Sequence, residues 1–511
     1  MPQSGSRPLQ KLSPLSICVP MNNHRLRRTL RAGLFSSLIA LTATAGGPAL
    51  ADTLPEALAD AYRSNPTLQS ARAQQRANDE NVPIERAAGL PSATLDATYS
   101  EFLKKSANAF TAPDRNLNGQ LQLGVPVYSG GAVKNSVRAA KTRVEAGQAD
   151  LRATESSVFS QVVAAYMDVI LQEAVVGLNR NLVRVLDVNL RATSDRFEIG
   201  DLTRTDVAQS QARLALARGD ARTAEANLAR AREQYIELVG HEPGRLAPPP
   251  PLPTLPATPE EAVVVALDRN PDLIAARERS DASKFDIDVA GAGRLPTVSL
   301  YTSGGYNDYF GTLGGSAGSA VFTQSETTAQ VGARLSLPIF QGGRPAALRR
   351  QAQARSAATM ETQIAVERDV IAQTRAAYTS WVASNELIQS NQTAVEAAEL
   401  SLEGVRAENS VGNRTILDIL DAEQELVSAQ VRLVTARRNA YVAAFTLLAA
   451  MGRAEARDLD LDTAILYDPE VNYARVRGKW FDWDDDPAPV VQSTRTVDTP
   501  VQGGDILPTT R

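Results

Sequence analysis

The chain has 511 residues, with 53 Lys/Arg, 58 Asp/Glu and a formal net charge of −5, and it contains one cysteine and two histidines. This acidic balance argues against nucleic acid as a partner. A zinc site or a Cys/His catalytic arrangement cannot be built from so few of these residues, and no cofactor loop stands out. The sequence therefore predicts a protein that is not an enzyme and that holds neither a metal nor a cofactor.

Residues 1–51 end in a pattern typical of a secretory signal, although the true start could be Met21. Arginines between positions 25 and 31 precede an apolar run over 32–45, and Ala49-Leu50-Ala51 follows as a cleavage site. A membrane anchor explains this run less well because it is short. Cleavage before Asp52 would leave 47 basic and 58 acidic residues, a net charge near −11. It would also remove Cys18, and with it any cysteine that could carry a lipid.

Residues 54–88 are predicted to be helical, with interruptions at Pro66 and Pro83. Two segments with the period of a strand follow, at 94–100 and 120–127, and the second half of the chain repeats them at 298–300 and 331–339. Each run is near the length of a tilted transmembrane strand, although a half-buried strand of a soluble protein gives the same alternation.

Four strands cannot close a barrel, because small barrels need eight or more. Closure would need about three chains and twelve strands. The strand pattern therefore gives a first indication of a trimer.

Long helices are predicted after each pair of strands, because residues 127–242 and 346–468 contain no proline. A helix from Ala132 to Ile199 would have 68 residues and be roughly 100 Å long. Further on, apolar residues recur every seven positions. We expect this seam to join an outgoing and a returning helix as a coiled coil. Its members are Leu420, Val427, Val434, Tyr441 and Leu448, with Leu417 and Val431 beside them.

A short motif predicts the turn between these helices. Gly412 can adopt the left-handed conformation that ends a helix, Thr415 can cap the next helix, and Asp418 completes a capping box. The same motif occurs at Gly200, Thr203 and Asp206. We therefore expect two tight hairpins of antiparallel helices.

These two motifs are 212 residues apart and belong to a longer duplication. Near the N-terminus the offset is 205, so seven extra residues lie between Pro296 and Pro338, in a Gly/Ser-rich stretch. Matching pairs at an offset of 212 are Pro126 and Pro338, Gly130 and Gly342, Tyr166 and Tyr378, and Gly240 and Gly452.

The expected organisation has five parts. They are a signal peptide at 1–51, a first repeat at 52–242, a proline-rich linker at 243–259, a second repeat at 260–452, and a C-terminal equatorial segment with a disordered tail at 453–511. Disorder is expected from about Val490. Trp480 and Trp483 are expected to pack against the outside of the helical layer.

The signal, the duplicated order of helices and strands, and the paired turns resemble the TolC family of outer-membrane efflux and secretion proteins. The resemblance covers residues 52–475 and is most specific at 411–421. It implies a mixed α/β membrane protein: a homotrimer with a twelve-stranded barrel in the outer membrane, continued by a long α-helical tunnel in the periplasm. The duct would be passive and serve a tripartite efflux pump or a type I secretion system. Its partners would be a periplasmic adaptor protein, an inner-membrane pump of the ABC or RND type, and outer-membrane lipid.

The resemblance also implies roles for residues of the turns. Arg414 matches an arginine that holds the tunnel tip shut, with partners at Thr205 and Asp206, and Asp418 and Asp421 match carboxylates that ring the pore. Asn409 departs from the family, since a tyrosine of the closing network stands there in the best-known member. Docking of the adaptor falls to the turns, at Gly200, Thr203, Val411, Gly412 and Thr415.

Physical arguments allow both pore and structural roles for the carboxylates. Asp418 and Asp421 share a helix face, and threefold symmetry would place six carboxylates in one constriction, where they attract cations and have raised, coupled pKa values. Capping alone could explain Asp206 and Asp418, and Arg414 could be a solvated turn residue. A periplasmic coiled-coil scaffold or adaptor without a barrel remains the alternative, but it does not predict two pairs of strands.

Overall fold

The computed structural model describes residues 52–105, 112–314, 322–459, 461 and 466–506, so the predicted signal at 1–51 lies outside the described residues. The first repeat contains α1 (Leu54–Ser64), α2 (Pro66–Asp79), α3 (Asn81–Ala87), β1 (Ser92–Glu101), β2 (Arg115–Ser129), α4 (Ala132–Glu198) and α5 (Arg204–Val239). The second contains α6 (Pro259–Arg269), α7 (Pro271–Ala292), β3 (Thr297–Asp308), β4 (Ser325–Ser336), α9 (Arg344–Ser410) and α10 (Ile416–Ala450). Then follow α11 (Pro469–Val476) and the short helix η2 (Thr496–Asp498).

The duplication is visible in the lengths of the elements. The helices α4 and α9 each have 67 residues, which makes each roughly 100 Å long. Likewise α2 and α3 together span the positions that the single helix α7 spans in the second repeat. The first repeat is broken at Glu80, three residues before Pro83, because proline has no N–H to donate to the preceding turn. Asp288 stands at the matching position of α7, which is continuous.

The four strands form one antiparallel sheet in the order β1-β2-β3-β4. Strand β2 belongs to the first repeat and β3 to the second. Their pairing joins the two repeats, although the whole first helical hairpin lies between these strands in the sequence. The outer edges, on β1 and β4, have no strand beside them in the described part of the chain. A sheet with two open edges cannot be stable in lipid, so these edges require strands from other chains.

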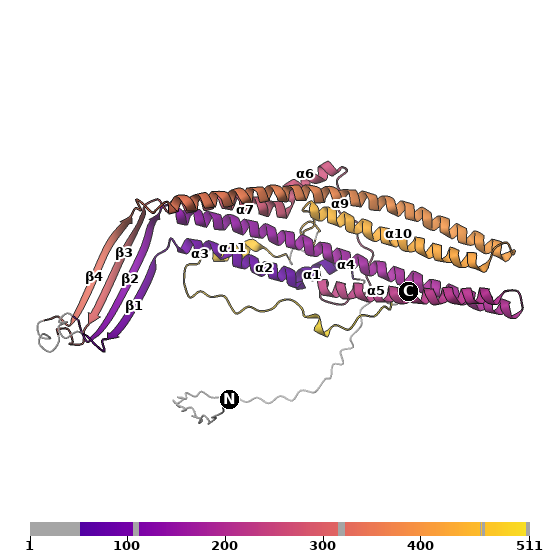
Figure 1. Ribbon diagram of the computed structural model, residues 1–511, viewed down its shortest axis with the longest axis horizontal. Coiled ribbons are helices and arrows are strands. Elements are labelled where there is room, and N and C mark those ends of the chain that lie inside the picture. The colour runs from indigo at the N-terminus through magenta and orange to yellow at the C-terminus, as the bar shows by residue number, and fades with distance from the viewer. Residues whose placement is uncertain (1–51, 106–111, 315–321, 460, 462–465, 507–511) are drawn as a thin grey trace, which may run out of the picture. The chain divides into compact units, whose positions relative to one another are not determined.

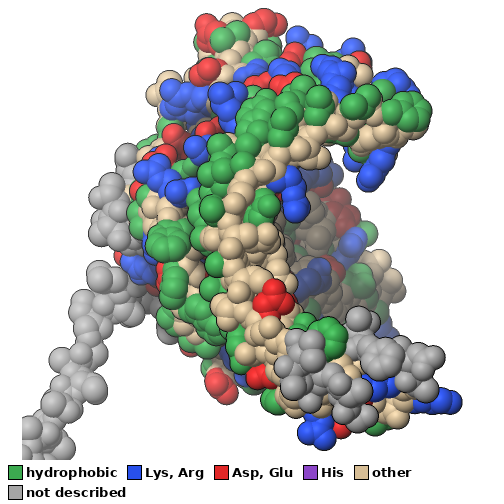
Figure 2. Space-filling model, turned by 90° about the vertical axis from the view of Figure 1, so that its left-hand side faces the viewer, with side chains coloured by type: hydrophobic (Ala, Val, Ile, Leu, Met, Phe, Trp, Pro, Cys, Tyr) green, Lys and Arg blue, Asp and Glu red, His purple; other side chains and the backbone are tan. Residues whose placement is uncertain are grey.

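One face of the sheet is apolar and the other is polar. Leu95 lies opposite Leu121, and Val125 lies opposite Leu300. On the other face, Asn118 donates to Asn307 at 2.6 Å and Gln330 donates to Ser303 at 2.8 Å. Figure 2, which faces this end of the molecule, shows mostly hydrophobic and uncharged side chains along the strands. This alternation is the one expected of a barrel with lipid outside and water inside.

The prediction of a strand over 331–339 is wrong at its C-terminal end, because β4 ends at Ser336 and leaves Leu337 and Ile339 outside it. The matching strand β2 continues to Ser129 because it has a second partner, β3, and follows it through a bulge near Pro126. Among the described residues, none pairs as a strand with the chain beyond Ser336. Pro338 also cannot donate a backbone hydrogen bond.

The helices form two antiparallel hairpins that lead away from the sheet, α4 with α5 and α9 with α10, and both turns lie at the end far from the strands (Figure 1). The main core lies midway and includes Phe159, Tyr166, Tyr235 and Phe445, all fully buried. The hydroxyl of Tyr166 donates to the carbonyls of Asp52 and Ala247, at 2.9 and 2.7 Å, and so fixes the start of the first repeat and the linker. One stretch of α4 is long and apolar enough to cross a membrane, but α4 packs against α5, α7 and α10.

The seven-residue seam does not face the partner that we expected. Leu420 and Val427 pack against Leu182, Leu186 and Leu214 of the first hairpin. The contact between α9 and α10 uses another column, in which Ala429 and Leu433 pack against Val395. The seam therefore joins the two hairpins to each other, and a neighbouring set of residues joins the helices of one hairpin.

The expectation of disorder beyond Val490 is also not met over residues 494–506. Buried Arg232 of α5 donates to the carbonyls of Gly503 and Asp505, at 3.1 and 2.8 Å. The side chain of Ile506 packs against the main core. Composition indicated disorder because this segment is rich in Pro, Thr and Gly, but its backbone carbonyls are held by an arginine from a distant helix.

Candidate functional site

The two hairpin turns have the geometry that their shared motif predicts. Gly200 and Gly412 adopt φ of 84° and 82°, a left-handed conformation that suits glycine. The residue after each glycine donates back into the end of the helix: Asp201 to the carbonyl of Arg196, and Asn413 to that of Glu408, both at 2.9 Å. These bonds satisfy carbonyls that a helix end leaves free.

Capping boxes start the returning helices. The backbone N–H and the hydroxyl of Thr203 donate to the carboxylate of Asp206, at 2.8 and 2.7 Å, and the N–H of Asp206 donates back to the hydroxyl. Thr415 and Asp418 repeat this arrangement. The hydroxyl of Thr203 lowers the pKa of Asp206, and that of Thr415 lowers the pKa of Asp418. The expected rise in pKa from crowding concerns carboxylates of three chains, whereas within one chain the capping bond acts on the pKa of Asp418 in the opposite direction.

Arg414 forms its contacts inside its own hairpin. Its Nε donates to the carboxylate of Glu408 at 2.7 Å, and its guanidinium lies 3.8 Å from the carboxylate of Asp418. The hydrogen bond to Glu408 raises the pKa of Arg414. In the parts of the chain that the structure describes, no hydrogen bond or ion pair joins Arg414 to Thr205 or Asp206, its expected partners on the first hairpin.

Asn409, which departs from the resemblance, binds the backbone of the same turn. Its side-chain amide donates to the carbonyl of Arg414 at 2.8 Å. An asparagine here stabilises the turn itself. Val411 is 70% exposed beside Gly412, and Thr205 is exposed on the first turn.

Asp421 has a partner that the sequence did not indicate. Arg213 of α5 forms an ion pair with Asp421 of α10, and so connects the first hairpin to the second near the turns. Further along the second hairpin, Arg406 of α9 pairs with the buried carboxylate of Glu423 of α10. The charge of Glu408 was available in the sequence six residues before Arg414, but nothing local links Arg213 to a residue 208 positions away.

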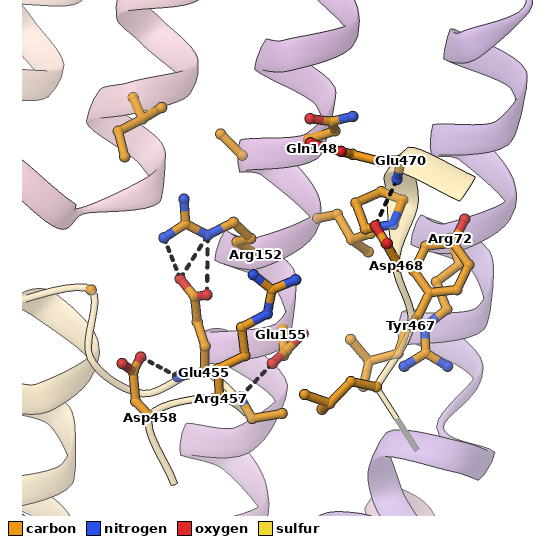
Figure 3. Close-up of a pocket in the computed structure, with 18 of the residues that line it drawn as sticks. Arg72, Gln148, Arg152, Glu155, Glu455, Arg457, Asp458, Tyr467, Asp468 and Glu470 are labelled. Carbon is orange, nitrogen blue, oxygen red and sulfur yellow. Dashed lines mark hydrogen bonds and ion pairs between the residues drawn. The ribbon is translucent and has the colours of Figure 1, made fainter. Parts of the chain in front are cut away.

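A second cluster of charged residues lies beside α4, between the strands and the hairpin turns, around a cavity of about 810 Å³ (Figure 3). The Nε of Arg152 of α4 donates to both carboxylate oxygens of Glu455, at 2.9 and 3.0 Å. The carboxylate of Glu155 accepts the N–H of Ala456 at 2.6 Å, and burial raises its pKa to about 7. These contacts attach the segment after α10 to α4.

Arg72 lines the same cavity and stacks on Tyr62, with its guanidinium 4.2 Å from the ring centroid. The acids and bases named here pair with one another or with aromatic rings and the backbone, which indicates a structural junction. No group of three or more metal-ligating side chains occurs in the described ranges.

Comparison with known proteins identifies the architecture. The sequence profile of the outer membrane efflux protein family matches residues 57–241 and 262–453. The chain belongs to this family. It is 33% identical to the outer membrane efflux protein BepC of Brucella suis, over 87% of this chain and 94% of BepC. It is 28% identical to the outer membrane protein TolC of Escherichia coli, over 89% of this chain and 94% of TolC.

Solved structures show the same fold. The Campylobacter jejuni CmeC outer membrane channel superposes with a TM-score of 0.69 at 17% identity, over 83% of this chain and 89% of that one. VceC of Vibrio cholerae superposes with a TM-score of 0.66 at 22% identity, over 78% and 96%. The resemblance stated from the sequence is thereby confirmed.

As a member of the outer membrane efflux protein family, the protein is an outer-membrane channel. Its fold is a trimeric twelve-stranded barrel continued by a helical tunnel in the periplasm, and each chain contributes four strands and two hairpins. It works with an efflux pump or a secretion system, and proteins of this family are channels, not enzymes. The alternative of a periplasmic scaffold without a barrel is not favoured.

Proposed function

We propose that the two hairpin turns form the periplasmic entrance of this exit duct, where a periplasmic adaptor docks and an inner-membrane pump delivers cargo. One observation carries the proposal: two turns of the same geometry lie together at the end of the molecule that is far from the strands (Figure 1). Around Gly200 and Gly412, nothing lies within 4 Å of where a side chain would begin. This open backbone suits contact with the tip of another protein.

In this proposal Arg414 closes the entrance and Asp421 lines it. Within one chain, Arg414 holds the second turn in shape through Glu408 and Asp418. We infer that in the trimer its guanidinium also reaches Thr205 or Asp206 of an adjoining hairpin, since about half of the side chain is exposed. Hydrogen bonds to charged groups are stronger than those between neutral groups, and threefold symmetry repeats each loss.

Conductance of the purified trimer in planar bilayers tests these roles. We expect Arg414→Ser to raise the resting conductance, because the entrance loses its charged hydrogen bonds. We expect Asp421→Ala to weaken cation preference and block by multivalent cations, because the constriction loses carboxylates. Arg432→Ser is the matched control, since Arg432 is an exposed arginine of α10 that pairs with Glu425.

The proposal fails if Arg414→Ser and the Arg432→Ser control have the same conductance. Equal selectivity and block in Asp421→Ala and the wild type would show that Asp421 serves only the ion pair with Arg213.

The class of pump and the cargo follow from the partner, because the duct itself is passive. Relatives at similar identity include an alkaline protease secretion protein of Pseudomonas aeruginosa and a cobalt-zinc-cadmium resistance protein of Cupriavidus metallidurans. Cross-linking through the turns, followed by identification of the captured inner-membrane protein, separates an ABC-type secretion system from an RND-type efflux pump. Capture that persists in Gly200→Trp and Gly412→Trp variants would contradict docking at the turns.

A further inference from the structure

Three aromatic side chains after α11 are exposed to solvent. Trp480, Phe481 and Trp483 have exposed fractions of 74%, 61% and 82%. The expectation that the two tryptophans pack on the helical layer is therefore wrong. Isolated exposed apolar residues are common, but three large aromatic rings within four residues suggest an interaction surface.

Ion pairs hold this aromatic loop, residues 479–486, in shape. Lys479 pairs with Asp484 at 3.1 Å, and Arg475 of α11 pairs with Asp486 at 2.6 Å. The N–H of Asp484 donates to the carbonyl of Phe481 at 3.2 Å, which closes a turn. The rings of Trp480 and Phe481 meet edge to face, with centroids 6.3 Å apart. Two of the four aspartates of the loop, Asp484 and Asp486, are thus paired with basic residues, while the aromatic rings are exposed.

The loop is tethered next to the base of the barrel. Arg86 of α3 donates to the carbonyl of Arg477 at 3.1 Å, and α3 ends five residues before β1 begins. Trp480 is the third residue after Arg477, a reach of roughly 10 Å. In Figure 1 α11 lies beside α2 and α3, close to the junction of helices and strands. The aromatic rings are therefore held near the level at which the barrel leaves the membrane.

A basic groove of about 870 Å³ lies at the same junction. It is lined by apolar residues, among them Val127 and Tyr128 at the end of β2, and by five basic residues: Arg86, Lys134, Arg138, Lys141 and Arg477. No Asp or Glu is found among the described residues that line it. Figure 2 shows Lys and Arg side chains gathered near the upper end of the strands.

We propose that this groove and the aromatic loop together bind the periplasmic leaflet of the outer membrane. The basic residues would bind the phosphate of an anionic phospholipid headgroup, and Trp480, Phe481 and Trp483 would lie at the interface between headgroups and acyl chains. Tryptophan prefers this level of a bilayer because its ring is apolar and its N–H is polar, and basic residues bind anionic lipid surfaces. The occupant is lipid because the groove is continuous with the barrel wall.

The inference rests on the outer-membrane location of the barrel and not on the proposed gate. Exposed tryptophans and a groove whose charged lining residues are all basic lie together at this level, and a lipid surface accounts for both. The loop would supply an attachment to the leaflet that is independent of the strands.

Tryptophan fluorescence in lipid nanodiscs tests the position of the loop. The chain has three tryptophans, and Trp381 lies in α9 beside Tyr378, so Trp381→Phe leaves only Trp480 and Trp483 to report. We expect phospholipids brominated near the headgroup end of the acyl chain to remove about half of the emission of the full-length trimer, as for rings at the interface. Lipids brominated near the chain end should quench less.

The matched control adds Val490→Ser and Val491→Ser, which remove exposed apolar side chains from the adjoining segment. This variant should be quenched as strongly as its parent. Emission that brominated lipids do not change overturns the proposal in either of two ways. Emission typical of water would show a solvated loop, and blue-shifted emission would show that another protein chain covers it.

The basic groove is tested by titrating brominated phosphatidylglycerol into phosphatidylcholine nanodiscs. We expect the double variant Lys134→Gln, Lys141→Gln to need a roughly tenfold higher fraction of anionic lipid for the same quenching, because each basic residue near a membrane surface contributes several-fold to binding. Arg191→Gln, at the far end of α4, should behave as wild type.

An unchanged titration in the lysine variant would overturn the phosphate site. Competition by millimolar inorganic phosphate would do the same, since it would identify a site for free anions. If the lysine variant forms an intact trimer but is not quenched at any lipid composition, the groove and the loop belong to one lipid contact. That result would support the proposal.

Discussion

Arg213 of α5 and Asp421 of α10 form an ion pair that joins the two helical hairpins of one chain near their turns. The carboxylate expected to line the pore is thus partly neutralised by an arginine of the other hairpin. Asp421 therefore has two possible effects in the entrance: it holds the hairpins together and it attracts cations.

Removing the arginine should separate these effects. We expect Arg213→Gln to raise resting conductance modestly, because an exposed pair contributes about 0–1 kcal/mol and is repeated in three chains. Cation preference should rise at the same time, because Asp421 is no longer neutralised. Bilayer recordings check both quantities, and the exchanged variant Arg213→Asp, Asp421→Arg should restore the conductance. Lower cation preference in Arg213→Gln would contradict this assignment.

Gly412 should tolerate asparagine but not a bulky aromatic residue. Its φ of 82° costs an ordinary residue roughly 1–2 kcal/mol, whereas asparagine adopts this conformation more easily. The site has open space, so Gly412→Trp should leave the trimer folded and inserted while preventing the adaptor from docking. Heat-modified gel mobility checks that the trimer is folded, and export by cells checks that the adaptor docks. Normal export in the tryptophan variant would show that the turn is not a docking surface.

Stability should fall as pH rises through the range in which Glu155 ionises. Burial raises the pKa of this carboxyl group from its ordinary 4.5 to about 7, so the folded state holds a proton that the unfolded state has already released. The cost of ionising it is absent below about pH 4.5 and complete above about pH 7, at no more than roughly 3 kcal/mol per chain.

We therefore expect Glu155→Gln to reduce the loss of thermal stability between pH 5 and pH 8, because glutamine still accepts the N–H of Ala456 without a charge. Circular dichroism melts at a series of pH values measure this. Glu145→Gln, at an exposed position of α4 on the rim of the same cavity, is the control. Parallel pH profiles for wild type and Glu155→Gln would contradict the prediction.

The C-terminal segment should be released by a single substitution at Gly504. A side chain there would meet the backbone oxygen of Glu225 at 2.6 Å, so Gly504→Leu cannot keep the present contact between the segment and α5. Arg232 would then lose its carbonyl partners, and we expect faster proteolysis near residue 500 together with a lower melting temperature. Gly503→Leu meets nothing within 4 Å and should leave proteolysis unchanged.

Local sequence determined the elements and the turns of this protein. A helix end needs a residue that accepts positive φ, and a helix start needs a side chain that accepts free N–H groups, so Gly412, Thr415 and Asp418 specify their turn without help from distant residues. Uninterrupted helix-forming sequence likewise determined the length of α4 and α9. Because the sequence is duplicated, the same turn and the same long helix form twice.

Tertiary structure decided which residues meet across the hairpins. The seven-residue seam at Leu420 and Val427 predicted an apolar contact, but periodicity alone cannot say which of several neighbouring helices receives it. The partner of Asp421 depends in the same way on how α5 lies beside α10. The order of residues 494–506 depends on buried Arg232, because a segment with little apolar surface stays in place only where a distant group binds its backbone.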